Sequence, residues 1–254
     1  MTKEQKENQE NNDEQQKEMS FFDHLEELRA KIIWSLVGLI IGCIIAGIFI
    51  NQIMDNFLLK PAITVGLKLQ NLRPFGQPFF YFKVILVSGI IISFPFIIYQ
   101  LWSFIEPGLY TKEKRWAKRI TFFTSLCFLS GVAFSYFVMI PSMLNFAALF
   151  GSDKIANIID INEYYSFIVM ILLAAGILFE MPMVAFILSR FGIISVKTMK
   201  RYRRHSIVAI LILAAVLTPT PDPISQLIFA TPLFVLYEIS IIIAKIGERK
   251  YLKG

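Results

Sequence analysis

Residues 32–50 form an uninterrupted run of nineteen residues without a charged side chain. At a rise of about 1.5 Å per residue, a helix of this length covers roughly 28 Å, which is close to the hydrocarbon thickness of a bilayer. A cleaved signal peptide is the alternative, but the run is too long for the hydrophobic region of such a peptide, and no small-x-small cleavage site follows it. The run therefore predicts a transmembrane helix.

Further apolar stretches predict an all-α polytopic membrane protein with six transmembrane helices. The chain is 56% hydrophobic and 17% charged, which is more apolar than the single core of a soluble domain could hide. A Pro-rich turn, "TPTPDP", separates the last two stretches, which are short: residues 206–217 cover only about 18 Å as a helix. After 32–50, the expected spans are 84–105, 120–141, 164–189, 206–217 and 224–244.

The N-terminal part of the chain has a different composition. Residues 1–19 are almost entirely Lys, Glu, Gln, Asn and Asp up to Glu18, so they predict a disordered polar extension on the cytoplasmic side. The membrane domain is expected to occupy residues 20–254. It begins with a capped amphipathic helix from Ser20, which is expected to lie in the membrane interface and to end at Arg29 and Lys31.

The distribution of basic residues predicts the orientation in the membrane. The positive-inside rule places both termini in the cytoplasm, because the loops on that side are rich in Lys and Arg and the opposite loops are not. The rule leaves open whether the last two stretches are two short spans or one re-entrant hairpin. The basic residues of the cytoplasmic segments after the second span are Lys112, Lys114, Arg115, Lys118, Arg119, Arg190, Lys197, Lys200, Arg201, Arg203, Arg204, Lys245, Arg249, Lys250 and Lys253.

The inventory of reactive side chains argues against an enzyme. The only histidines are His24 and His205, and no zinc-protease helix, serine-hydrolase elbow or pair of intramembrane aspartates is present. Cys43 and Cys127 lie in apolar stretches without metal-ligand spacing. No cofactor or metal is expected. Nucleic acid is not expected as a partner either, because the net charge of +6 is dispersed over the loops.

Acidic residues inside the predicted spans carry the largest free-energy cost of insertion into the membrane. Glu180 lies near mid-membrane, where an acidic side chain costs roughly 2.5–3.5 kcal/mol. It could face a cavity or a polar group of another protein, or it could be an internally hydrogen-bonded residue that fixes packing. Pro182 favours a kink beside it. Glu238 is expected to be interfacial or paired with another helix, and Lys83 is expected to be an interfacial anchor.

Carboxylates also occur on the predicted cytoplasmic side, where the positive-inside rule calls only for basic residues. Glu26 and Glu27 precede Arg29, while Glu106 and Glu113 lie in a loop rich in cations. Such carboxylates could bind a basic peptide, since an arginine pairs with a carboxylate through two hydrogen bonds. They could equally form solvated pairs with the neighbouring Lys and Arg.

Five motifs in this order resemble the TatC family, the multi-span receptor subunit of the twin-arginine protein translocase. They are "FFDHLEELRAK", "PFIIYQLWSFIEPGLYTKEKR", "GVAFSYFVMIP", "GILFEMP" and "LTPTPDPISQ", between Phe21 and Gln226. The resemblance implies a cupped protein with two short final spans. It would bind twin-arginine signal peptides and, with a single-span TatA/TatB-type subunit, use the proton-motive force to export folded proteins.

The resemblance also implies roles for individual residues. Glu27 and Glu113 would meet the arginine pair, with Arg29 and Phe104 beside them and Glu106 as a third carboxylate. Glu180 would line the concave face, where a TatA-type helix could dock. Further positions match family motifs at which substitution tends to impair transport: Pro61, Pro95, Tyr136, Asp222 and Gln226.

Some features depart from the family pattern. The polar extension is an addition, Lys31 stands where arginine is frequent, and the turn that carries Asp222 has one extra residue. The implied location is the bacterial cytoplasmic membrane, with a homo-oligomer within the complex and the lipid bilayer as surroundings. The alternative is a proton-coupled secondary transporter that uses Glu180, but the internal repeat typical of that class is not evident.

Overall fold

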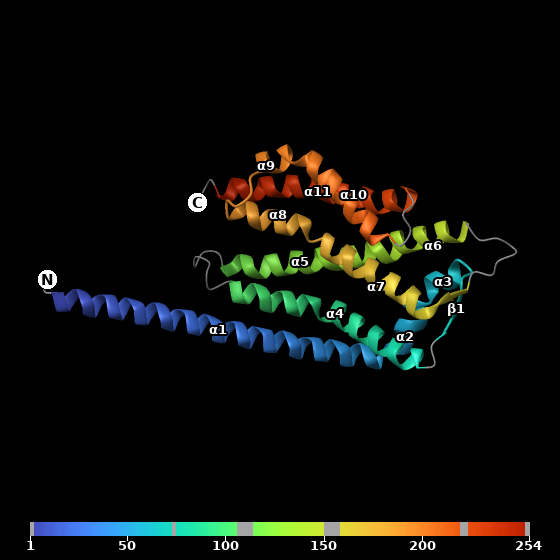
Figure 1. Ribbon diagram of the computed structural model, residues 1–254, viewed down its shortest axis with the longest axis horizontal. Coiled ribbons are helices and arrows are strands. Elements are labelled where there is room, and N and C mark those ends of the chain that lie inside the picture. Colours follow the sequence, from blue (N-terminus) through green and yellow to red (C-terminus); the bar gives the residue numbers. More distant parts are fainter. Residues whose placement is uncertain (1–2, 73–74, 106–113, 150–157, 219–222, 252–254) are drawn as a thin grey trace.

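The computed structural model describes residues 3–72, 75–105, 114–149, 158–218 and 223–251. Side chains are described from Leu25 onward, apart from residues 105, 114–118, 147, 149 and 249–251. The described chain is a bundle of long helices whose two terminal helices, α1 and α11, have their free ends at the same end of the molecule (Figure 1). We call this the terminal end and the other the far end.

Long helices traverse the molecule between these two ends. The elements in chain order are α1 (Lys3–Ile48), α2 (Ile50–Ile53), the π-helix η1 (Met54–Leu58), α3 (Lys60–Thr64), β1 (Lys68–Gln70), α4 (Gly76–Ile105), α5 (Lys114–Phe134), the π-helix η3 (Ser135–Met139), α6 (Ile140–Leu149), β2 (Ile158–Asp160), α7 (Ile161–Leu178), α8 (Met181–Arg190), α9 (Val196–Arg201), α10 (Arg203–Leu217) and α11 (Pro223–Tyr251).

Among the described residues, five stretches are long and apolar enough to cross a membrane: Leu25–Ile48, Gly76–Phe104, Arg119–Phe146, Ile161–Arg190 and Pro223–Glu248. The prediction of an all-α polytopic membrane protein is therefore confirmed. The helix α10 has 15 residues, which is roughly 22 Å. The count of six spans stays a prediction, with α10 as the sixth and shortest.

The first helix differs from the expectation. We predicted an interfacial helix ending at Arg29 and Lys31, followed by a separate span, but α1 continues without a break from Lys3 to Ile48. No proline or glycine lies between Ser20 and Gly38, so nothing in that stretch interrupts the backbone hydrogen bonds of a helix. The disorder expected for residues 1–19 and the domain boundary at residue 20 remain predictions.

Small residues bring α1 and α4 together. A Cβ atom on Gly42 would lie 2.6 Å from the carbonyl oxygen of Gly89, and one on Gly89 would lie 2.9 Å from the backbone nitrogen of Cys43. Glycine is thus required at both positions for the two backbones to approach this closely, as is common between helices in membranes. Outside this contact, many large apolar side chains of α1 are exposed, including Ile40 and Ile44.

The predicted kink at Pro182 is confirmed. The helix α7 ends at Leu178, and α8 begins at Met181 with Pro182 in its first turn, where a proline is tolerated. Glu180 is the residue immediately before α8. On the C-terminal side, α8 packs along α11, where the hydroxyl of Ser189 donates to the carbonyl oxygen of Ala244 over 2.7 Å.

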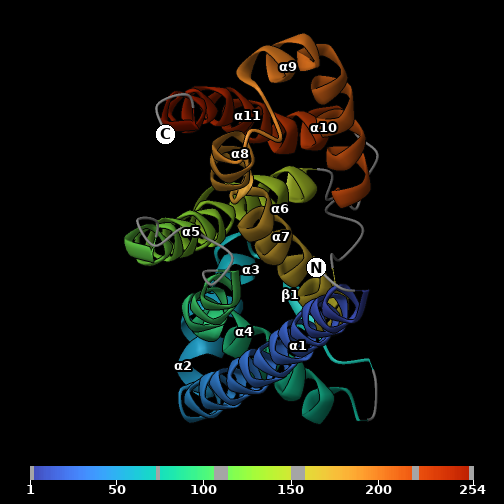
Figure 2. The ribbon, with the colours of Figure 1, turned by 90° about the vertical axis from the view of Figure 1, so that its left-hand side faces the viewer.

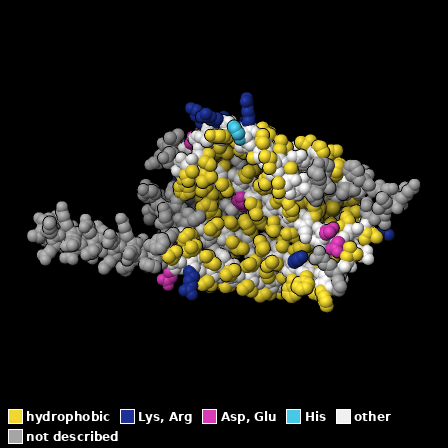
Figure 3. Space-filling model, in the orientation of Figure 1, with side chains coloured by type: hydrophobic (Ala, Val, Ile, Leu, Met, Phe, Trp, Pro, Cys, Tyr) yellow, Lys and Arg dark blue, Asp and Glu magenta, His cyan; other side chains and the backbone are white. Residues whose placement is uncertain are grey.

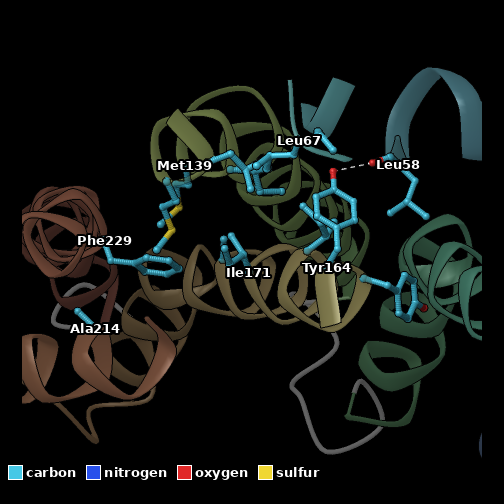
Figure 4. Close-up of a cluster of buried hydrophobic side chains, with 14 of the residues drawn as sticks. Leu58, Leu67, Met139, Tyr164, Ile171, Ala214 and Phe229 are labelled. Carbon is cyan, nitrogen blue, oxygen red and sulfur yellow. Dashed lines mark hydrogen bonds between the residues drawn. The ribbon is translucent and has the colours of Figure 1, made fainter. Parts of the chain in front are cut away.

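The buried core connects α7 to the elements on both sides of it. In Figure 4, Ile171 and Tyr164 lie along α7, while Met139 and Phe229 come from neighbouring elements. The hydroxyl of Tyr164 donates to the carbonyl oxygen of Leu58 over 2.8 Å. Viewed from the terminal end, α1 and α10 both extend beyond α7 on the same side, so the layer of helices bends around α7 (Figure 2). We call this side the concave face.

A small sheet joins two loops at the far end. The strands β1 and β2 pair in parallel, with Lys68 opposite Ile158 and Gln70 opposite Asp160. Asp160 then caps α7, because its carboxylate accepts hydrogen bonds from the backbone nitrogens of Asn162 at 2.6 Å and Leu72 at 3.3 Å. The hydrogen bond from Asn162 is the largest cause of a lowered pKa of the Asp160 carboxyl, and the one from Leu72 adds to it.

Candidate functional site

The terminal end brings together the predicted receptor residues that the structure describes. Glu27, half-buried, and Arg29, exposed, lie on α1, and Phe104, half-buried, lies at the end of α4. The ammonium group of Lys31 donates to the hydroxyl of Ser103 over 2.7 Å. Because Glu27 and Lys31 are four residues apart on one helix, they share a face, so this bond holds the Glu27 face of α1 against the end of α4 that carries Phe104.

The sequence analysis missed this contact. In the sequence, Lys31 stands out only as a departure from the arginine frequent in the family, and Ser103 carries no local signal of a partner. A local signal was available, since a lysine at the end of an apolar run needs a polar partner when its helix packs against another. The other two predicted receptor residues, Glu106 and Glu113, lie outside the described residues.

Glu180 lies between α7 and α8 in the middle of the molecule and is half-buried. Its Oε1 atom is buried and has no hydrogen-bond partner among the residues that the structure describes, and no described cation forms an ion pair with it. Figure 3 shows that side chains near the middle of this face of the molecule are mostly hydrophobic. A carboxylate in such surroundings favours a polar partner from outside the chain.

Glu238 on α11 has a partner within the chain. Its Oε2 atom accepts a hydrogen bond from a guanidinium nitrogen of Arg203 at 2.6 Å, where α10 begins. The two side chains are 32% and 46% exposed, so the pair is partly solvated. The expectation that Glu238 is paired with another helix is therefore confirmed.

The remaining motif residues lie mostly toward the far end. Pro61 is buried in α3, and the hydroxyl of Tyr136 donates to the carbonyl oxygen of Asn56 over 3.3 Å. The side-chain amide of Gln226 donates to the carbonyl oxygen of Leu211 over 3.0 Å and so ties α11 to α10. Pro95 lies within α4. These contacts indicate a role in holding the helices in register. Asp222 lies outside the described residues.

The described residues include no group of three or more His, Cys, Asp or Glu side chains that could hold a metal ion. His205 is exposed, and its ring lies 5.5 Å from that of Tyr202. Cys43 and Cys127 are free thiols. Charged and polar side chains thus gather at the terminal end, and in the described part of the chain the carboxylate of Glu180 stands alone among apolar side chains.

Comparison with known proteins gives consistent results. The family described as "TatC: Sec-independent protein translocase protein (TatC)" matches residues 23–232. The Sec-independent protein translocase protein TatC of Carboxydothermus hydrogenoformans is 37% identical over 94% of this chain and 98% of its own length. TatCy of Bacillus subtilis is 32% identical over 93% of each chain.

A solved structure is similar throughout its length. The crystal structure of a twin-arginine translocase receptor, TatC, superposes with a TM-score of 0.76 at 35% sequence identity. The match covers 88% of this chain and 99% of that one.

Proposed function

This chain belongs to the TatC family of Sec-independent protein translocase proteins, and we propose that it is the signal-peptide receptor and core subunit of a twin-arginine translocase. In this role it would export folded proteins across the bacterial cytoplasmic membrane, driven by the proton-motive force. The similar crystal structure is named as a twin-arginine translocase receptor. The family consists of components of a protein translocase, in agreement with the expectation that the chain is not an enzyme.

The observation that carries the proposal is the contact between the middle of α1 and the end of α4. The Lys31–Ser103 hydrogen bond places a carboxylate, Glu27, and an aromatic side chain, Phe104, on adjoining helices at one end of the molecule. A twin-arginine motif presents two guanidinium groups, which carboxylates bind through paired hydrogen bonds. Glu113 would supply the second carboxylate, with Arg29 and Glu106 at the edge of the same patch.

The test is photocrosslinking of a twin-arginine peptide to a variant that carries both Glu27→Ala and Glu113→Ala. We expect the crosslink to be lost while the protein still inserts into the membrane. Glu26→Ala is the matched control, because Glu26 is an exposed carboxylate one position away and should leave the crosslink intact. Unchanged crosslinking in the double variant would refute the receptor assignment.

The orientation and the partners are part of the same proposal. Both termini would face the cytoplasm, because the exposed basic residues Lys197, Lys200, Arg201 and Arg204 are at the terminal end, around α9. A single-span TatA/TatB-type subunit would dock at Glu180, and further copies of this chain would join the complex. Protease cleavage of a C-terminal tag in inverted membrane vesicles, but not in intact cells, would support this orientation.

The alternative, a secondary transporter with Glu180 as its proton relay, gains no support from the comparisons, whose named relatives are translocase proteins. Glu180 keeps a proposed role as a docking group, and its test is given in the Discussion.

A further inference from the structure

A pocket of about 370 Å³ opens among α4, α7 and α10 near the far end of the molecule. Its volume is near the lower end of the range, about 300–1,000 Å³, that is typical of small-molecule sites. Two of its lining side chains carry opposite charges: Lys83 from α4 and Glu163 from α7. In Figure 3, basic and acidic side chains lie toward the far end of this face, with hydrophobic and other side chains between them. The pocket therefore combines two opposite charges with apolar side chains.

Neither charge is neutralised by a described part of the chain. Lys83 and Glu163 are both exposed, and neither forms an ion pair with another described residue. Lys83 is the eighth residue of the apolar stretch Gly76–Phe104, so it lies about 10 Å along that helix from its start. An ammonium group near the entry of a span is stabilised when an anion pairs with it. The pocket therefore favours a ligand that brings its own charges.

The polarity of the pocket changes along α7. Asn162, Glu163 and Ser166 line it from the first turns of the helix, and Phe167 and Met170 line it further into the membrane stretch. Leu217, the last residue of α10, adds to the apolar part. A ligand that fits this gradient is polar toward the far end and apolar toward the middle of the membrane. A phospholipid has this order of groups, with the headgroup at the interface and the acyl chains below it.

We propose that this pocket binds one glycerophospholipid whose headgroup contains a phosphate and a primary amine. The ammonium of Lys83 pairs with the phosphate, and the carboxylate of Glu163 accepts hydrogen bonds from the amine, which are stronger than neutral ones because both groups are charged. Phe167, Met170 and Leu217 contact the upper part of the acyl chains. A small soluble phosphate with an amine would leave these three side chains uncovered, so the lipid is the better fit.

The proposal is independent of signal-peptide binding, and its test needs no export assay. The full chain is purified in detergent, delipidated and titrated by native mass spectrometry with phosphatidylethanolamine, phosphatidylglycerol or phosphatidylcholine of identical acyl chains. We expect one phosphatidylethanolamine to bind about tenfold more tightly than phosphatidylglycerol, because one charge-assisted contact is added. Phosphatidylcholine should resemble phosphatidylglycerol, since its quaternary nitrogen has no hydrogen to donate.

Three variants separate the two charges. Glu163→Gln should abolish the preference for phosphatidylethanolamine while phosphatidylglycerol still binds, whereas Lys83→Gln should weaken all three lipids and Lys83→Arg should restore them. The matched controls are Asp55→Asn and Lys68→Gln, exposed charges outside the pocket, and these should bind lipid as the wild type does. The preference is a ratio within one variant, so a moderate loss of stability does not mask it.

Three results would overturn the proposal. The first is an equal preference in wild type, Glu163→Gln and Lys83→Gln. The second is displacement of bound lipid by free phosphoethanolamine at the same concentration as by added lipid, which would assign the pocket to a soluble ligand. The third is crosslinking of a photoreactive group at Met170 to a precursor peptide in native membranes, without any crosslink to lipid.

Discussion

Two glutamates in the membrane-spanning helices differ in whether the chain provides an ion-pair partner. Glu238 on α11 is ion-paired with Arg203 through Oε2 at 2.6 Å, and its buried Oε1 atom has no hydrogen-bond partner among the described residues. Glu180, between α7 and α8, has a buried Oε1 atom without a hydrogen-bond partner and no ion pair among the described residues. The same type of side chain thus has an ion-pair partner in one region and none among the described residues in the other, and we propose that the second is the docking group. Acidity inside a span does not distinguish the two cases, and the presence of a nearby cation does.

Gly89→Ala measures how far a loss of packing between α1 and α4 destabilises the protein without any change of charge. Gly89→Ala should lower the free energy of unfolding by about 2–3 kcal/mol, because the new Cβ atom would lie 2.9 Å from the backbone nitrogen of Cys43. Gly47→Ala is the matched control, since its Cβ atom would meet only Ile85 at 4.0 Å. Thermal unfolding in detergent measures both variants. Equal stability would mean that α1 and α4 do not pack as closely as described.

Glu180→Ala tests the proposed role of Glu180 in docking the single-span partner. We expect co-purification of the single-span partner to fall about tenfold, equivalent to about 1.4 kcal/mol, while twin-arginine peptide crosslinking survives. Glu238→Ala should change co-purification less than twofold, because Arg203 already occupies that carboxylate. Undiminished co-purification in Glu180→Ala would mean that Glu180 is a packing residue and that its role does not differ from that of Glu238.

Arg203→Ala tests whether the ion pair between Arg203 and Glu238 stabilises the fold. It should lower stability by about 1 kcal/mol, a small value because both side chains are partly exposed. Arg204→Ala serves as the control, since Arg204 is an exposed neighbour. In a double-mutant cycle, adding Glu238→Ala should cost little more than Arg203→Ala alone. Full additivity of the two losses would show that the pair is not coupled.

The smallest effect is expected at Asp160, outside the membrane-spanning helices. Its pKa is lowered from the ordinary value of 3.8 by the backbone hydrogen bond from Asn162 and, to a smaller extent, by that from Leu72. A lowered pKa in the folded state stabilises the fold above pH 3.8 and loses that contribution as the pH falls through the folded value. The unfolding temperature should therefore drop in strong acid, and less so in Asp160→Asn. An identical dependence of the unfolding temperature on pH in both proteins would contradict a stabilising role for the hydrogen bonds of the Asp160 carboxylate.

Much of the fold follows from local sequence patterns. The apolar stretches predict the helices, Pro182 predicts the break beside Glu180, and the short final spans predict that Glu238 is interfacial or paired with another helix. Local patterns do not reveal contacts between distant segments. The β1–β2 pairing joins residues 68–70 to 158–160, and the bond of Lys31 to Ser103 joins residues 72 positions apart. The pocket between Lys83 and Glu163 likewise exists only once α4 and α7 are packed.

The receptor residues were assigned through the family motifs. Composition alone left open whether Glu27 and Glu113 bind a peptide or pair with neighbouring cations, because both readings require the same charges. The structure adds the position of Glu27 beside the end of α4, and Glu106 and Glu113 lie outside the described residues. The peptide contacts therefore have to be mapped by experiment.

The most direct test of the receptor assignment is photocrosslinking from residues 110–115 to a twin-arginine signal peptide in native membranes. We predict a strong crosslink to the native peptide and loss of that crosslink when both arginines of the peptide are replaced by glutamine. Equal crosslinking of the two peptides would contradict the claim that carboxylates at this end of the molecule recognise the arginine pair.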